Sequence, residues 1–139
     1  MKLLLGSGGV RTPERKSMYL QLMNENFRGC QKILFIPYAS KDYDEYTNKV
    51  REMFKQSEYE IIGIHESDNP IQEIREMEGI YVGGGNTFTL VRKLHEEGLI
   101  ESIRERVTED NVPYAGVSAG SNVACPTMQT TNDMPIELV

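Results

Sequence analysis

The chain has 139 residues, a length typical of one domain, with 21 acidic and 15 basic side chains and a formal net charge of −6. This acidic balance argues against a nucleic-acid groove, and no apolar segment is long enough for a membrane span or a signal peptide. The two cysteines, Cys30 and Cys125, fit neither a disulfide framework nor a zinc site, so we expect reduced thiols in a cytoplasmic protein.

Apolar strands alternate with amphipathic helical segments. In chain order we expect a strand at 3–5, a helix at 14–26, a strand at 33–37, a helix at 45–55, a strand at 61–64, a helix at 70–77, a strand at 80–82, helices at 88–97 and 99–108, and a strand at 113–117. Short, nearly all-apolar strands separated by helices are typical of a parallel sheet covered on both faces. We therefore predict a single α/β domain over residues 1–139 with a doubly wound, mostly parallel sheet.

A nucleophile-elbow pattern, Gly-x-Ser-x-Gly, follows the last predicted strand as Gly116-Val117-Ser118-Ala119-Gly120. Small neighbours at a sharp strand-to-helix turn let the serine hydroxyl stand clear of the sheet, and the amide after the serine points at the developing oxyanion. The other interpretation is a small residue that only serves a tight turn. Because Asn122-Val123-Ala124 can continue as a helix, the context favours Ser118 as the nucleophile and the Ala119 amide as an oxyanion donor.

A glycine run, Gly83-Gly84-Gly85-Asn86, follows the predicted strand at 80–82. Alone it fits a phosphate-binding or merely tight turn equally well. Beside an elbow, it favours the Gly85 amide as the second oxyanion-hole donor, with Gly84 and Asn86 as candidate substrate-binding residues. Ligands of doubly wound sheets bind outside the carboxyl ends of the strands, so we expect Ser118 and this run to gather there, together with the Gly6–Gly9 turn.

No cofactor or metal is expected. The Gly6–Gly9 turn does not complete a dinucleotide fingerprint, because Arg11 stands where the third glycine belongs. No His, Asp and Glu cluster has ligand spacing for a metal. A serine nucleophile needs an adjacent base. However, His65 is predicted to end the third strand and His95 to lie on a solvated helix face, and neither is favoured as that base.

Three blocks in order resemble peptidase E, the aspartyl dipeptidase of the serine peptidase family related to cyanophycinase. They are Val82-Gly83-Gly84-Gly85-Asn86-Thr87-Phe88, the segment 116–127 and Thr130-Thr131-Asn132-Asp133-Met134-Pro135. The resemblance implies a flavodoxin-like fold related to class I glutamine amidotransferases, and hydrolysis of dipeptides with an amino-terminal aspartate. By motif match, Ser118 is the nucleophile, Gly85 and Ala119 donate amides, and Asp133 is the acid of the charge relay, with a downstream glutamate as its rival.

The family's catalytic histidine lies beyond the position that matches Val139, and neither His65 nor His95 matches it. We therefore expect a chain that lacks the carboxyl-terminal part of the family and is nearly inert alone, with a bare sheet edge that favours a homodimer. A cationic group should bind the carboxylate of an aspartyl substrate. The candidates for this group are Arg11, Arg15, Lys16 and a downstream arginine. The alternatives are an inactive binding or regulatory module and an amidotransferase-like or esterase activity.

Overall fold

The computed structural model describes residues 2–6, 12–117 and 120. Within this part, five strands form one sheet: β1 (Leu3–Gly6), β2 (Lys32–Ile36), β3 (Glu60–Gly63), β4 (Gly79–Val82) and β5 (Tyr114–Val117). The helical elements are α1 (Pro13–Asn26), α2 (Tyr43–Met53), the short 3-10 turn η1 (Ile64–Glu66), α3 (Pro70–Glu76), α4 (Thr87–Glu96) and α5 (Ile100–Thr108). Every predicted strand and helix up to residue 117 is present.

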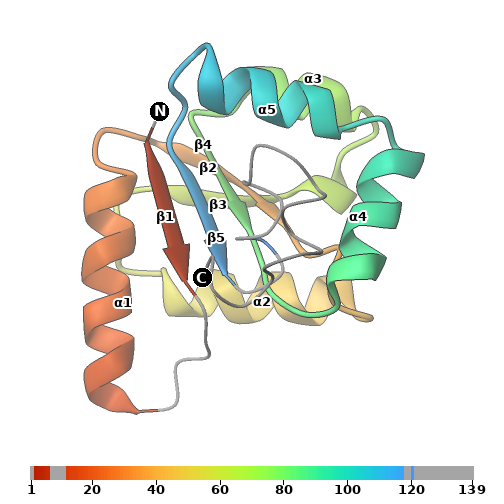
Figure 1. The fold of residues 1–139 in the computed structure, drawn as a ribbon. Coiled ribbons are helices and arrows are strands. Elements are labelled where there is room, and N and C mark those ends of the chain that lie inside the picture. The colour runs from red at the N-terminus through yellow and green to blue at the C-terminus, as the bar shows by residue number, and fades with distance from the viewer. Residues whose placement is uncertain (1, 7–11, 118–119, 121–139) are drawn as a thin grey trace.

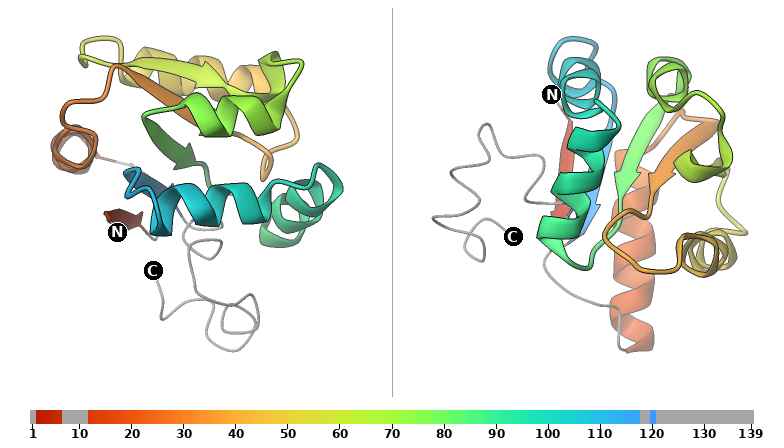
Figure 2. Two further views of the ribbon diagram at one scale, coloured as in Figure 1. Left: turned by 90° about the horizontal axis from the view of Figure 1, so that it is seen from above. Right: turned by 90° about the vertical axis from the view of Figure 1, so that its right-hand side faces the viewer.

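The sheet is parallel throughout, with strand order β1-β5-β4-β2-β3. Because side chains alternate along a strand, β2 sends Ile33 and Phe35 to one face and Leu34 and Ile36 to the other. The first face packs against α1 and α2, and the second against α3, α4 and α5 (Figures 1 and 2). The predicted doubly wound α/β fold is thereby confirmed.

Side-chain caps set where the helices begin. Asp42 accepts a hydrogen bond from the Glu45 amide at 3.0 Å, and α2 therefore begins at Tyr43, two residues before the predicted start. The third strand was predicted to run through Ile64, but β3 ends at Gly63 and the chain turns into η1. His65 consequently lies in η1 and not at the end of the strand.

The order of the strands creates a crevice between β2 and β4. The connection after β2 runs through α2 on one face of the sheet, whereas the connection after β4 runs through α4 and α5 on the other. The loops that follow these neighbouring strands therefore diverge, and such a switch point is where ligands bind in open α/β sheets. No helix in the described part of the chain is both long and apolar enough to cross a membrane.

Candidate active site

The carboxyl ends of β1, β5 and β4 lie side by side. Gly6 pairs with Val117 across β1 and β5, and Val82 pairs with Gly116 across β4 and β5. The expected gathering of strand ends is thus observed for the described residues at these ends. Ser118 follows Val117 in sequence, and it lies outside the described residues, as do Ala119, Asp133 and the segment 122–124.

The last glycine of the elbow pattern lies against β4. A β carbon at Gly120 would fall on the carbonyl oxygen of Val82, well inside the 3.0 Å that real β carbons keep. The hydroxyl of buried Tyr114, on β5, donates a hydrogen bond to the Gly120 carbonyl. Glycine is therefore required at position 120 for close packing, which is the steric reason for a small residue in an elbow.

The Gly83–Asn86 turn is anchored to the end of β2 and to the loop that follows it. The Gly83 amide donates to the Ile36 carbonyl at 3.1 Å, and the Asn86 amide donates to the Ala39 carbonyl at 3.0 Å. Gly85 has φ of 140°, and a β carbon there would overlap the Ala39 carbonyl oxygen. This combination of positive φ and close backbone approach admits only glycine.

The two central amides of this turn differ in their partners. The Gly84 amide donates to the hydroxyl of Tyr46 at 3.0 Å. Among the described residues, no acceptor takes the Gly85 amide. Of these two N–H groups, only the one at Gly85 is without an acceptor among the described residues, and its role as an oxyanion donor stays a prediction.

Asn86 caps helix α4. Its side-chain oxygen accepts a hydrogen bond from the Thr89 amide at 2.9 Å, which satisfies one of the free donors in the first turn. The side chain that the sequence suggests as a substrate contact thus has a structural partner through its oxygen. Its role toward substrate stays a prediction.

A pocket of about 480 Å³ lies at the switch point, between the loop after β2 and the glycine turn after β4. Its lining residues are Ser40, Lys41, Asp42, Glu45, Tyr46, Lys49, Gly84 and Gly85. Sequence reasoning missed the contributions from residues 40–49, because only the folded chain brings them to Gly84 and Gly85. Their position just after a predicted strand was the available signal.

Two cationic groups line this pocket, and neither was considered from the sequence. Lys49 forms an ion pair with Glu45 at 2.9 Å. Lys41 is exposed and makes no ion pair with any described residue. Arg15 and Lys16 lie exposed in the first turn of α1 and do not line the pocket, and Arg11 falls outside the described residues.

His65 lies far from the end of β5, and His95 is exposed on α4. β3, which leads into His65, is three strand positions from β5, which corresponds to roughly 14 Å at the usual spacing. The His65 Nε2 atom lies 2.9 Å from an Asp44 carboxylate oxygen. His95 is exposed near the end of α4. That neither ring serves as the base of Ser118 stays a prediction, because Ser118 lies outside the described residues.

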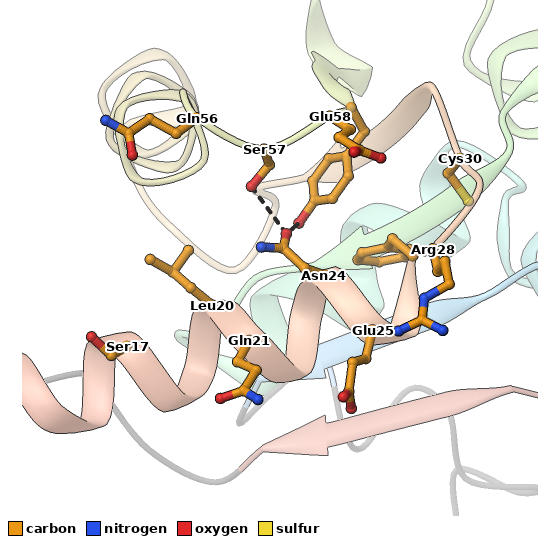
Figure 3. Close-up of a pocket in the computed structure, with 12 residues that line it drawn as sticks. Ser17, Leu20, Gln21, Asn24, Glu25, Arg28, Cys30, Gln56, Ser57 and Glu58 are labelled. Carbon is orange, nitrogen blue, oxygen red and sulfur yellow. Dashed lines mark hydrogen bonds between the residues drawn. The ribbon is translucent and has the colours of Figure 1, made fainter.

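A larger pocket, of about 720 Å³, lies elsewhere (Figure 3). It is lined by α1 and by residues 56–59, and its central polar group is Asn24, which accepts hydrogen bonds from Ser57 and Tyr59. Since Cys30 and Tyr59 precede β2 and β3, this pocket borders the amino ends of the strands, opposite the elbow. No group of three His, Cys, Asp or Glu side chains among residues 2–6, 12–117 and 120 could hold a metal ion.

Several known proteins are similar to this chain in sequence. Peptidase E of Nostoc sp. is 44% identical over 139 residues, which cover 97% of this chain and 57% of that protein. The "Probable alpha-aspartyl dipeptidase" of Drosophila melanogaster is 46% identical over 104 residues, covering 75% of this chain and 43% of its own length. This chain thus spans about half the length of the curated relatives it matches.

A solved structure agrees with the sequence comparison. The crystal structure of a "Putative Peptidase E Protein" from Listeria monocytogenes EGD-e superposes with a TM-score of 0.68 at 26% identity, covering 96% of this chain and 67% of that one. The family model of Peptidase family S51 matches residues 2–139. This chain belongs to peptidase family S51.

Proposed function

We propose that the chain carries the nucleophile of a serine dipeptidase that hydrolyses dipeptides with an amino-terminal aspartate. Membership of family S51 and the name of the Drosophila relative support the reaction and the substrate class. The observation that carries the proposal is the packing of Gly120 on Val82, because it joins the elbow pattern to the strand that leads into the Gly83–Asn86 turn.

In this mechanism, the Ser118 hydroxyl attacks the carbonyl carbon of the peptide bond. The amides of Gly85 and Ala119 donate to the oxyanion of the tetrahedral intermediate, and removal of one such donor typically lowers the rate by roughly 10²–10³. Asp133 is the proposed acid partner of the base. The amide nitrogen then leaves with the proton that the base took from Ser118, and water hydrolyses the acyl-enzyme.

We propose that the base comes from outside these 139 residues. His65 is held at the far edge of the sheet and His95 is exposed on α4. We propose a histidine that follows Val139 or belongs to a second chain, and a homodimer would form at an edge strand of the described sheet, β1 or β3. The sequence of the coding region beyond the Val139 codon distinguishes these two sources.

Lys41 is our candidate for the group that binds the carboxylate of the aspartyl substrate. It lines the pocket beside Gly84 and Gly85, and it forms no ion pair with a described residue. An ammonium group at such a pocket favours a substrate with a negatively charged side chain. The buried thiol of Cys30 fits the cytoplasmic location that we propose.

The rival proposal is a binding or regulatory module that retains the pocket without turnover. Hydrolysis of Asp-X dipeptides, compared with matched Asn-X dipeptides, tests the leading proposal. Faster cleavage of the Asp-X series supports it. Binding of Asp-X dipeptides without cleavage, by a protein whose coding region ends at Val139, would favour the inactive module.

A further inference from the structure

Tyr46, on helix α2, reaches across to the glycine turn that follows β4. We infer that Tyr46 is a positioning residue: it fixes the Gly83–Gly84 peptide and thereby sets the direction of the following peptide, whose Gly85 amide would bind the oxyanion, an inference that rests on the proposed function. Its hydroxyl accepts a hydrogen bond from the Gly84 amide at 3.0 Å. This is a contact between residues 38 positions apart in the chain.

The Tyr46 ring occupies the space where a side chain at position 83 would be. A β carbon on Gly83 would lie 2.6 Å from the Tyr46 hydroxyl oxygen and 2.7 Å from a ring carbon. On another side, the ring meets Phe35 of β2 edge to face, with 5.0 Å between centroids. The turn and the sheet therefore both restrict the tyrosine, so its hydroxyl is held at a fixed place relative to Gly84.

Helix α2 fixes the backbone from which Tyr46 projects. The Tyr46 amide donates to the Asp42 carbonyl at 3.2 Å, and the Asp42 side chain caps the same turn of the helix. Burial raises the pKa of the Tyr46 phenol, whereas the Gly84 amide opposes that shift. The phenol thus stays neutral near pH 7 and offers an oxygen lone pair to Gly84.

Tyr46 completes a set of three anchors around Gly85. Gly83 is tied to the Ile36 carbonyl, Asn86 is tied to the Ala39 carbonyl, and Gly84 is tied to Tyr46. Oxyanion donors are effective because they are oriented before the charge develops. Without the Tyr46 hydroxyl, the Gly84 amide loses its partner, the Gly83–Gly84 peptide can rotate, and the direction of the Gly85 amide that follows it is less fixed.

The substitution Tyr46→Phe removes the hydroxyl and keeps the ring. Tyr59→Phe is the matched control, because it also removes one hydroxyl, the donor to Asn24 at 2.9 Å, near the opposite end of the sheet. We expect amide hydrogen exchange of Gly84, followed by NMR, to become at least about tenfold faster in Tyr46→Phe alone. Exchange of the Gly83 amide, which donates to Ile36, should not change.

The kinetic signature is a lower kcat with an unchanged KM. We expect kcat for Asp-X hydrolysis to fall about tenfold in Tyr46→Phe, less than the roughly 10²–10³ for outright loss of an oxyanion donor. Tyr59→Phe should leave both constants unchanged. Unaltered Gly84 exchange, or a rise in KM at constant kcat, would overturn the inference. If the protein completed by the segment or partner chain that supplies the histidine cleaves no Asp-X dipeptide, the proposed function fails, while the exchange measurement still decides whether Tyr46 orders the turn.

Discussion

Gly120 and Val82 are in backbone contact, the former from the elbow pattern after β5 and the latter from the last position of β4. No side chain fits between them, since a β carbon at position 120 would overlap the Val82 carbonyl oxygen. The contact sets how closely Gly120 approaches the strand that leads into the Gly83–Asn86 turn. The elbow pattern and the Gly83–Asn86 turn, which are 30 or more residues apart in sequence, thus share one packing constraint.

Replacement of Gly120 by alanine should displace the elbow. Because the clash is with backbone, relief requires movement of the chain, and we expect the free energy of unfolding to fall by about 1–3 kcal/mol. Denaturant unfolding of the variant measures this loss. Gly6→Ala is the control, since the nearest atom to its β carbon would be the Gly116 oxygen at 3.9 Å. Equal stability of the two variants would show that Gly120 does not pack as described.

Replacement of Gly85 by alanine should affect both stability and catalysis. The positive φ and the overlap with the Ala39 carbonyl act together at this position. At Gly98, φ is 69° and no atom lies within 4 Å of a β carbon, so Gly98→Ala isolates the cost of the positive φ alone. We expect Gly98→Ala to lose about 1 kcal/mol of stability and to retain activity. Gly85→Ala should lose more stability and nearly all hydrolysis, and full activity in this variant would contradict the proposed role of its amide.

Two substitutions at Asn86 separate capping from substrate contact. Asn86→Ala removes the acceptor for the Thr89 amide and should lower the free energy of unfolding by about 1 kcal/mol. Asn86→Ser keeps an oxygen acceptor without adding charge and should keep the stability. If Asn86→Ser is as stable as the parent but has a higher KM, the side chain contacts substrate. An unchanged KM would limit Asn86 to its capping role.

Substitution of Lys41 tests whether its ammonium group recognises the acidic side chain of the substrate. Lys41→Gln should raise KM for Asp-X dipeptides about fivefold, corresponding to about 1 kcal/mol of lost attraction. KM for the matched Asn-X dipeptides should change little. Lys55→Gln is the control, because Lys55 pairs with Glu52 near the end of α2 and does not line the pocket. An equal rise in KM for both substrate series would argue against charge recognition by Lys41.

Much of the fold follows from local sequence patterns. The apolar segments at 33–37 and 80–82 become β2 and β4, and the glycine turn follows β4 as expected. The apolar composition of a segment does not reveal which side chains it buries, however. In α1, Met23 is buried, whereas Met18 and Leu22 are 58% and 42% exposed, because only one face of the helix meets the sheet.

Local sequence patterns could not predict which residues line the candidate site. Tyr46 and Lys41 carry no motif that links them to Gly84, and their contact depends on the strand order that places β2 beside β4. The pattern of apolar residues in a segment predicts a strand, but it does not predict which other strand lies beside it in the sheet. The sequence placed His65 at a strand end, and only the strand order shows that β3 lies three strand positions from β5.

The central claim is that Ser118 is the nucleophile of an aspartyl dipeptidase. The direct measurement is turnover of an Asp-containing chromogenic dipeptide by the native protein and by its Ser118→Ala variant. We predict cleavage by the native protein and a fall in kcat approaching the roughly 10⁶ seen when a serine protease such as subtilisin loses its nucleophile. Full activity in Ser118→Ala would contradict the account.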